Sequence, residues 1–105
     1  MADAADAGVE ISDNPAEERF EARIGGTLAG LAQYLRSADV IAFTHTEVDL
    51  AHEGRGVGSA LARGALDAAR EAGLKVVPVC PFFAGYIRKH PEYQPLVHEK
   101  GDGAP

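Results

Sequence analysis

The hydrophobic period of this chain changes across one glycine-rich stretch, Val48–Ala60. Before it, Val40–Val48 is rich in branched and aromatic residues and is apolar on both faces at its start, which is typical of a central strand. After it, Val57–Ala72 carries apolar residues at helical spacing opposite a charged stripe. Because Leu74–Cys80 returns to strand-forming residues, these segments predict a right-handed β-α-β unit with parallel strands.

The segments before this unit alternate polar and apolar residues, which favours strands. Gly25-Gly26 predicts a two-residue hairpin turn with positive φ. Leu and Ala in Thr27–Arg36 would also suit a helix, but its alternation favours a strand. The predicted antiparallel meander consists of Val9–Asp13, Arg19–Ile24, Thr27–Arg36 and Val40–Val48. A short helix, Pro81–Lys89, and an irregular or extended piece, Glu92–His98, complete an α/β (α+β) fold with one mixed sheet.

The chain has 105 residues, which is enough for one domain with its own core but too few for two. We expect this domain to span 9–98, between a small acidic tail at 1–8 and a second tail at 99–105. No apolar run approaches the roughly 20 residues of a membrane span. The acidic start lacks the apolar stretch of a signal peptide, so we expect a cytoplasmic protein. The single cysteine excludes an internal disulfide, which agrees with that expectation.

The formal net charge of -6 argues against a general nucleic-acid binder, because such proteins usually present a basic face. It is compatible with a cationic amine substrate. It is equally compatible with plain solubility, which is the reading we favour for the charge alone.

The glycine-rich turn predicts a phosphate cradle. Gly54, Gly56 and Gly58 allow close approach of a ligand to the main chain. The amides of the turn would point outward at a helix start, where unpaired donors and the positive dipole end favour a pyrophosphate. The amides in question belong to Arg55, Gly56, Val57, Gly58 and Ser59.

Other ligands of such turns fit less well, and some glycine-rich turns bind nothing. A P-loop needs a Gly-Lys pair, which the chain lacks. A dinucleotide site needs a third glycine where Ala60 or Leu61 stands, and an acidic residue at the end of the next strand, where Val79 and Cys80 stand instead.

Pro78 interrupts the strand that follows the helix. Proline cannot donate to a ladder, so this strand is unpaired on one side there. An ordinary edge strand explains this equally well. Beside a phosphate cradle, however, a splayed pair of parallel strands would leave a slot for an extended ligand.

Taken together, four short motifs resemble the GNAT acetyltransferase superfamily and, within it, the small single-domain YjdJ-type branch. They are H-T-E-V (His45–Val48), G-R-G-V-G (Gly54–Gly58), V-P-V-C-P-F (Val77–Phe82) and Y-I-R-K-H-P-E-Y (Tyr86–Tyr93). The resemblance covers Val9–Val97. It implies a GNAT-like mixed sheet, acetyl-coenzyme A as cosubstrate and an amine as acceptor.

The resemblance also implies roles for particular residues. In the superfamily's pyrophosphate signature Gly56 and Gly58 match, whereas Glu53 occupies the Arg or Gln position. The pantetheine arm would bond along the main chain of Glu47 and Val48, in the gap beside Pro78. The usual Asn after the next strand is replaced here by Cys80, and Tyr86 is an approximate match to the usual Tyr.

Acetyl transfer to an amine needs a polarised carbonyl, a neutral nitrogen and a proton for the departing sulfur. Donors at the strand end can hold the oxyanion. As the N-cap of a helix, Cys80 would have a lowered thiol pKa and could accept the acetyl group or protonate the leaving sulfur. The alternative for Cys80 is a buried small hydrophobe. His45 and Glu47 share one strand face and could relay the amine proton, or could form an ordinary sheet-face pair.

The remaining histidines carry less weight. We expect His90 and Tyr93 to pack at the helix end, and His52 to be solvated. The four histidines, His45, His52, His90 and His98, show no metal-ligand spacing.

The leading functional hypothesis is an acetyl-coenzyme A-dependent N-acetyltransferase acting on a primary amine. The alternative is a coenzyme A or acyl-coenzyme A binding module with little or no turnover, since the short chain leaves little room for an acceptor pocket. A third hypothesis is a partner-binding subunit that uses its acidic surface. The acceptor and the oligomeric state stay open.

Overall fold

The computed structural model describes residues 8–52 and 54–98. The expected tails lie outside this part of the chain, except for Gly8. The strands are β1 (Val9–Asn14), β2 (Arg19–Ile24), β3 (Thr27–Arg36), β4 (Val40–Val48) and β5 (Lys75–Pro78). The α-helices are α1 (Val57–Glu71) and α2 (Pro81–Lys89), and the 3-10 helices are η2 (Pro15–Glu17), η3 (Leu50–His52) and η4 (Pro91–Leu96).

The five strands form one mixed sheet in the order β1-β2-β3-β4-β5. The first four pair antiparallel, and β4 pairs parallel to β5, which confirms the predicted meander and crossover. Gly25 and Gly26 form the predicted turn with φ of 56° and 83°. Thr27–Arg36 is a strand throughout, as its alternation indicated.

The structure corrects two predicted boundaries. The last strand ends at Pro78 and not at Cys80, because the chain turns there and the Val79 amide bonds back to the Val77 carbonyl. The piece expected to be irregular or extended is mostly the 3-10 helix η4, which Pro91 begins. After η4, Val97 forms a parallel bridge with Val76 and so covers part of the outer edge of β5.

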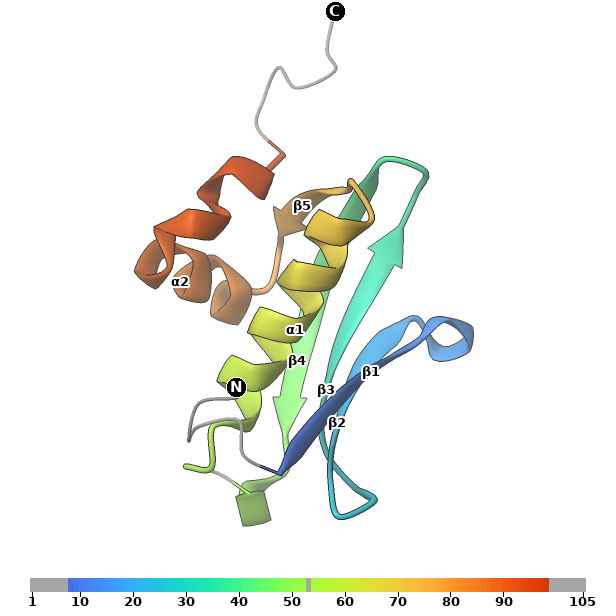
Figure 1. Ribbon diagram of the computed structural model, residues 1–105, viewed down its shortest axis with the longest axis vertical. Helices are drawn as coiled ribbons and strands as arrows, with labels where there is room; N and C mark the ends of the chain where they lie inside the picture. Colours follow the sequence, from blue (N-terminus) through green and yellow to red (C-terminus); the bar gives the residue numbers. More distant parts are fainter. Residues whose placement is uncertain (1–7, 53, 99–105) are drawn as a thin grey trace, which may run out of the picture.

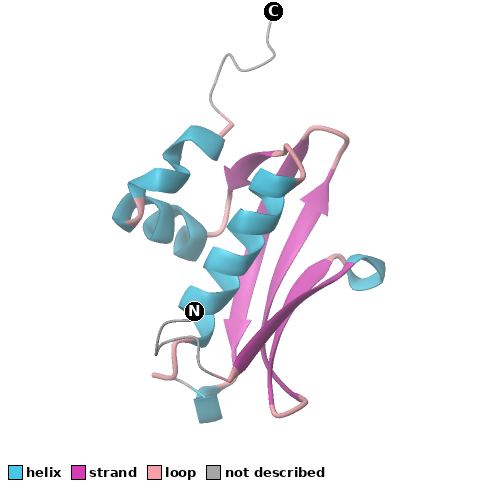
Figure 2. Cartoon of the chain, viewed as in Figure 1, coloured by secondary structure: helices cyan, strands magenta, loops and turns pink. Residues whose placement is uncertain are grey.

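Both α-helices pack on one face of the sheet (Figure 1). The core joins them to the strands: Phe43 of β4 stacks on Phe83 of α2 with ring centroids 4.3 Å apart. A β-carbon at Gly30 of β3 would lie only 3.0 Å from a Val57 methyl group of α1. Figure 2 shows α1 drawn across the strands, with α2 beside it near β5.

The other face of the sheet, which we call the open face, carries polar side chains. His45 and Glu47 of β4 are exposed there. Glu21 of β2 is the buried exception, and it accepts hydrogen bonds from Asn14, Arg19 and Arg23. No helix in the described residues is long and apolar enough to cross a membrane.

Candidate active site

The parallel pair β4–β5 comes apart halfway along β4. Its last pair is Phe43 with Pro78, as expected from a proline that cannot donate to the ladder. The Cys80 amide makes one more bond, to the Phe43 carbonyl (2.9 Å). Beyond it, β4 continues as Thr44–Val48 with β3 as its strand partner. This part of β4 therefore borders a gap on the side that β5 has left.

A β-bulge decides which peptide groups of β4 face this gap. Gln33 pairs with His45 but Tyr34 pairs with Phe43, so Thr44 is the extra residue. Past the bulge, the Asp49 amide bonds to the Ala29 carbonyl of β3 (2.8 Å). Because bonding pairs alternate along an antiparallel ladder, the peptide groups of Glu47 also face β3. Those of Thr46 and Val48 face the gap.

The turn before α1 has glycines with positive φ, but one of the amides predicted to be available is not. Gly54 and Gly56 have φ of 82° and 76°. The Arg55 amide, however, donates to the His52 carbonyl (3.3 Å), so it is already engaged within the loop. The amides from Gly56 to Ser59 donate to no described residue, as is usual in the first turn of a helix. Glu53, the departure from the pyrophosphate signature, lies outside the described residues.

Gly58 is needed for packing. It lies within α1, and a β-carbon there would be 2.9 Å from Cζ of Phe82, the second residue of α2. Phe82 remains partly exposed. The contact brings the amino-terminal ends of α1 and α2 together. The expectation that Gly58 is bare for a ligand is therefore corrected, since an aromatic ring already uses that space.

Cys80 is the predicted N-cap of α2 and is buried. Its Sγ lies 3.4 Å from Oγ1 of Thr46, across the gap between β5 and β4. Burial raises the pKa of the Cys80 thiol, but the Thr46 hydroxyl and the nearby backbone amides of Phe83 and Phe82 outweigh it. The net pKa is lower than usual, although α2 makes no formal cap hydrogen bond to this side chain.

His45 and Glu47 form a second group, on the open face. Nε2 of His45 lies 2.9 Å from Oε2 of Glu47, and both side chains are more than half exposed. The predicted shared face is thus confirmed. The pair stands on the stretch of β4 that borders the gap.

Tyr86 belongs to a third group, among the helices. It is buried and stacks on His90 with ring centroids 4.0 Å apart, and Tyr93 lies 6.1 Å away. Tyr93 donates to Oδ1 of Asp67 in α1 (2.7 Å). His90 and Tyr93 therefore pack at the helix end, as predicted.

The burial of His52 differs from the prediction of a solvated side chain. The residue is half-buried, and its Nδ1 atom is shielded from solvent without a hydrogen-bond partner among the described residues. The prediction of a solvated side chain is therefore wrong for this atom. Across residues 8–52 and 54–98, no three His, Cys, Asp or Glu residues gather in a way that would hold a metal ion.

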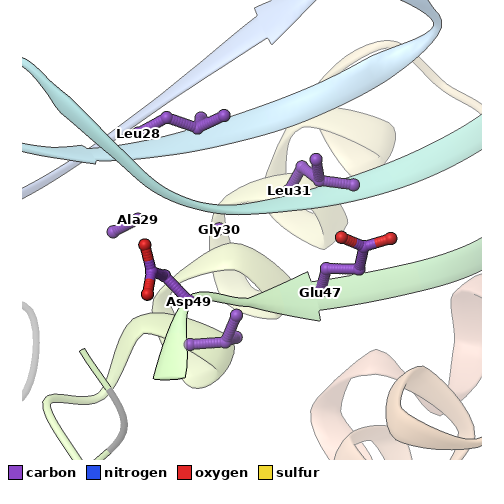
Figure 3. A pocket seen from close by; sticks show the side chains of 7 residues that line it. Leu28, Ala29, Gly30, Leu31, Glu47 and Asp49 are labelled. Carbon is purple, nitrogen blue, oxygen red and sulfur yellow. The ribbon is translucent and has the colours of Figure 1, made fainter. Parts of the chain in front are cut away.

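A hollow of about 230 Å³ lies on the open face, across β3 and the end of β4. Figure 3 shows Leu28, Leu31 and Glu47 projecting to the same side of these strands, with Asp49 at one end. Ala29, Gly30 and Val48 complete its lining. Of this group the sequence had indicated only Glu47 and Val48. The bulge residues Ala29 and Thr44, which reset the faces of β3 and β4, carry no recognisable sequence signal.

Comparisons with known proteins agree with this architecture. The family model described as GCN5-related N-acetyl-transferase matches residues 19–96. Protein NATD1 of Gallus gallus is 29% identical over 92 residues, which are 86% of this chain and 84% of that protein. These matches cover most of the described residues.

Two solved structures have the same fold. The solution structure of a GCN5-like protein from Staphylococcus aureus is 27% identical with a TM-score of 0.64, covering 90% of this chain and 92% of its own. Ard1 from Thermoplasma volcanium is 25% identical with a TM-score of 0.54, covering 74% of this chain and 55% of its own. The predicted mixed sheet is thereby confirmed.

Proposed function

The chain belongs to the GCN5-related N-acetyltransferase family, and we propose that it transfers the acetyl group of acetyl-coenzyme A to a primary amine. Family membership supports an acyltransferase. The observation that carries the finer assignment is the gap beside Thr44–Val48, with the amino-terminal ends of both α-helices next to it. We also infer the small single-domain YjdJ-type branch, which the similar extent of the Staphylococcus aureus structure supports.

The residues around the gap suit the parts of coenzyme A. The amides of Gly56, Val57, Gly58 and Ser59 would hold the pyrophosphate, because they make no bond to a described residue and lie at the positive end of α1. Arg55 would contribute through its exposed side chain and not through its amide.

The pantetheine arm would add to the free edge of β4. The gap-facing peptide groups of Thr46 and Val48 can bond to it as a further strand would. Glu47 and Val48 were expected in this role from the resemblance. Because the peptide groups of the ladder alternate, we propose that Thr46 and not Glu47 makes this main-chain contact, and that Glu47 acts through its side chain.

When bound, acetyl-coenzyme A supplies an acetyl thioester: a C–N bond to the amine forms, the C–S bond breaks, the amine loses a proton and the leaving sulfur takes one up. Glu47, with His45 at 2.9 Å, would accept the amine proton at the open face. The lowered pKa of Cys80 increases the fraction of thiolate, which is the form that attacks a thioester. It therefore supports transient acetylation, in which the Cys80 sulfur bonds to the acetyl carbon as the C–S bond to coenzyme A breaks, and the amine then takes the acetyl group from Cys80. Tyr86 is the other candidate acid, and its burial among the helices counts against a direct contact.

Binding is tested by calorimetry with acetyl-coenzyme A on the wild type, Ser59→Ala and Ser59→Pro. Proline in the first helical turn removes one amide whose acceptor lies outside the helix, whereas alanine keeps that amide. We expect the affinity of Ser59→Pro to fall about tenfold below that of Ser59→Ala, the effect of one charge-assisted hydrogen bond. Equal affinities of Ser59→Pro and Ser59→Ala for acetyl-coenzyme A would contradict pyrophosphate binding by the amides of this turn. Absence of any binding would favour the partner-binding subunit.

Chemistry is tested by mass spectrometry after incubation with acetyl-coenzyme A, with and without a panel of amines, on the wild type and Cys80→Ala. Transfer to an amine supports the proposal, and an acetyl group on the wild-type protein that Cys80→Ala lacks identifies the acylated thiol. Binding without any acetylated cysteine, amine product or hydrolysis would leave the alternative, a coenzyme A binding module with little or no turnover.

A further inference from the structure

We propose that the hollow on the open face is the acceptor site, and that it selects a short aliphatic diamine. This inference rests on the proposed function, because it assigns the acceptor of the same reaction. The hollow lies on the face opposite the helices and has Glu47 in its lining. Glu47 is thus shared between the hollow and the proposed proton-accepting pair with His45.

The charge of the lining fits a cationic occupant. Its two ionisable side chains are the carboxylates of Glu47 and Asp49, and both are exposed. The interactions found within the described residues use Oε2 of Glu47, with His45, and Oδ1 of Asp49, with the Ala51 amide (2.9 Å). Each carboxylate therefore keeps a second oxygen for a ligand.

The apolar part of the lining fits a methylene chain. Leu28 and Leu31 are half-buried, and they flank the hollow on the β3 side while the carboxylates stand on the β4 side (Figure 3). A monoamine would place its ammonium group at one carboxylate only, and the other carboxylate would keep only its contact within the protein. A diamine would satisfy both and cover the leucines with its chain.

The spacing of the carboxylates limits the length of the occupant. Residues two apart on an extended chain lie about 6.6 Å apart. Asp49 still pairs with Ala29 of β3, so the chain has not yet turned away at this point. That separation is comparable to the distance between the two nitrogens of a short aliphatic diamine. The nitrogen at Glu47 would be acetylated, and the nitrogen at Asp49 would stay protonated and unchanged.

The matched probes are cadaverine and pentylamine, which share the same methylene chain and differ in the second amine. Both are titrated into the isotope-labelled full chain and followed by the amide resonances. We expect shifts at Leu28–Leu31 and Glu47–Asp49, and a Kd for cadaverine about tenfold below that for pentylamine. Equal affinities, or shifts confined to other parts of the chain, would overturn the proposal. So would binding of a lysine-rich peptide in preference to cadaverine.

The matched variants are Asp49→Asn and Asp39→Asn. Asparagine keeps the carbonyl oxygen that accepts the Ala51 amide, so Asp49→Asn removes the charge without removing the turn. We expect the preference for cadaverine to fall about tenfold in Asp49→Asn. It should persist in Asp39→Asn, which changes the same residue type in the distant exposed turn before β4. Persistence of the preference in Asp49→Asn would remove Asp49 from the site.

Release of coenzyme A from acetyl-coenzyme A, measured with both amines, separates this inference from the proposed function. Equal kcat/KM for cadaverine and pentylamine would leave the N-acetyltransferase standing and overturn the diamine site. Selective cadaverine binding at the hollow without release of coenzyme A would overturn the N-acetyltransferase and leave the diamine site standing.

Discussion

The ring of Phe82 occupies the space that a side chain at Gly58 would need, with its Cζ atom 2.9 Å from the ideal β-carbon position. The two residues lie in the first turns of α2 and α1. Their contact sets how closely the two helix ends approach one another. We expect this contact to set the width of the entrance through which the proposed pantetheine arm would reach β4.

Gly58→Ala tests this contact. The new methyl group gains helix propensity, about 1 kcal/mol, but must push the Phe82 ring aside. Because Phe82 is 41% exposed, the ring has room to move outward, and we expect the unfolding free energy to change by less than about 1 kcal/mol. Calorimetry should show acetyl-coenzyme A binding about tenfold more weakly.

Gly85→Ala is the matched control for Gly58→Ala. Its nearest neighbour would be Nη2 of Arg88 at 3.5 Å, an ordinary contact within α2. We expect it to be as stable as the wild type or more stable, with normal affinity for acetyl-coenzyme A. If Gly58→Ala also bound normally, the contact with Phe82 would have no part in the entrance.

Thr46→Val should raise the pKa of Cys80. The Thr46 hydroxyl lies 3.4 Å from Sγ and favours the thiolate, so its removal leaves the effect of burial less opposed. The pH at which alkylation by iodoacetamide is half-maximal should move upward, and the rate at neutral pH should fall. Thr44→Val is the control, because the Thr44 hydroxyl donates to the Gln33 carbonyl. An identical pH profile in Thr46→Val and the wild type would contradict this role.

Glu47→Gln should slow transfer in a pH-dependent manner. An amine attacks only when neutral, and the proposed base makes it so at neutral pH. We expect kcat/KM at neutral pH to fall about a hundredfold. The deficit should shrink as the pH approaches the amine pKa of about 10, where solvent supplies the neutral amine. A deficit that is constant with pH would show that Glu47 binds the acceptor without accepting its proton.

Glu21→Gln should remove an acid-sensitive part of the stability. Hydrogen bonds from Asn14 and Arg19, with a further one from Arg23, lower the pKa of Glu21 to about 2. A carboxyl group with a depressed folded pKa stabilises the fold above its unfolded pKa, and this contribution is lost as the pH falls towards about 2. Urea unfolding should therefore show Glu21→Gln to be less stable than the wild type at pH about 7, and the two should converge as the pH drops below about 4.3.

Glu10→Gln is the control for that measurement, because Glu10 is an exposed residue of the neighbouring strand β1. We expect it to follow the wild type at every pH. A stability difference for Glu21→Gln that does not depend on pH would attribute its role to packing and not to charge.

Local chemistry explains why much of the fold could be predicted. The alternation in Arg19–Ile24 and the glycines at Gly25-Gly26 act through the conformations of a few adjacent residues, so they are legible in the sequence. Pro78 likewise has no amide hydrogen to donate, and the ladder between β4 and β5 ends at its pair with Phe43. The N-cap position of Cys80 follows in the same way from Pro81, the next residue.

The arrangement of the candidate site was less predictable. The sequence placed His45 beside Glu47 because period-two alternation is a local rule. It could not place Thr46 beside Cys80, which are brought together by the crossover through α1. Tyr86 was matched by its approximate position in a motif, and the packing of α2 on η4 put it in the aromatic group with His90 and Tyr93 instead.

By itself, the sequence determined the order of strands and α-helices along the chain and the glycine-rich turn into α1, and it marked Pro78 as a residue that cannot donate to a ladder. Only the tertiary structure decided which peptide groups line the gap and which side chains form the hollow. The physical reason is the bulge at Thr44. One extra residue there reverses which of the following peptide groups point towards β3 and which point towards the gap. A bulge depends on the register between two strands, and no single strand's residues specify that register.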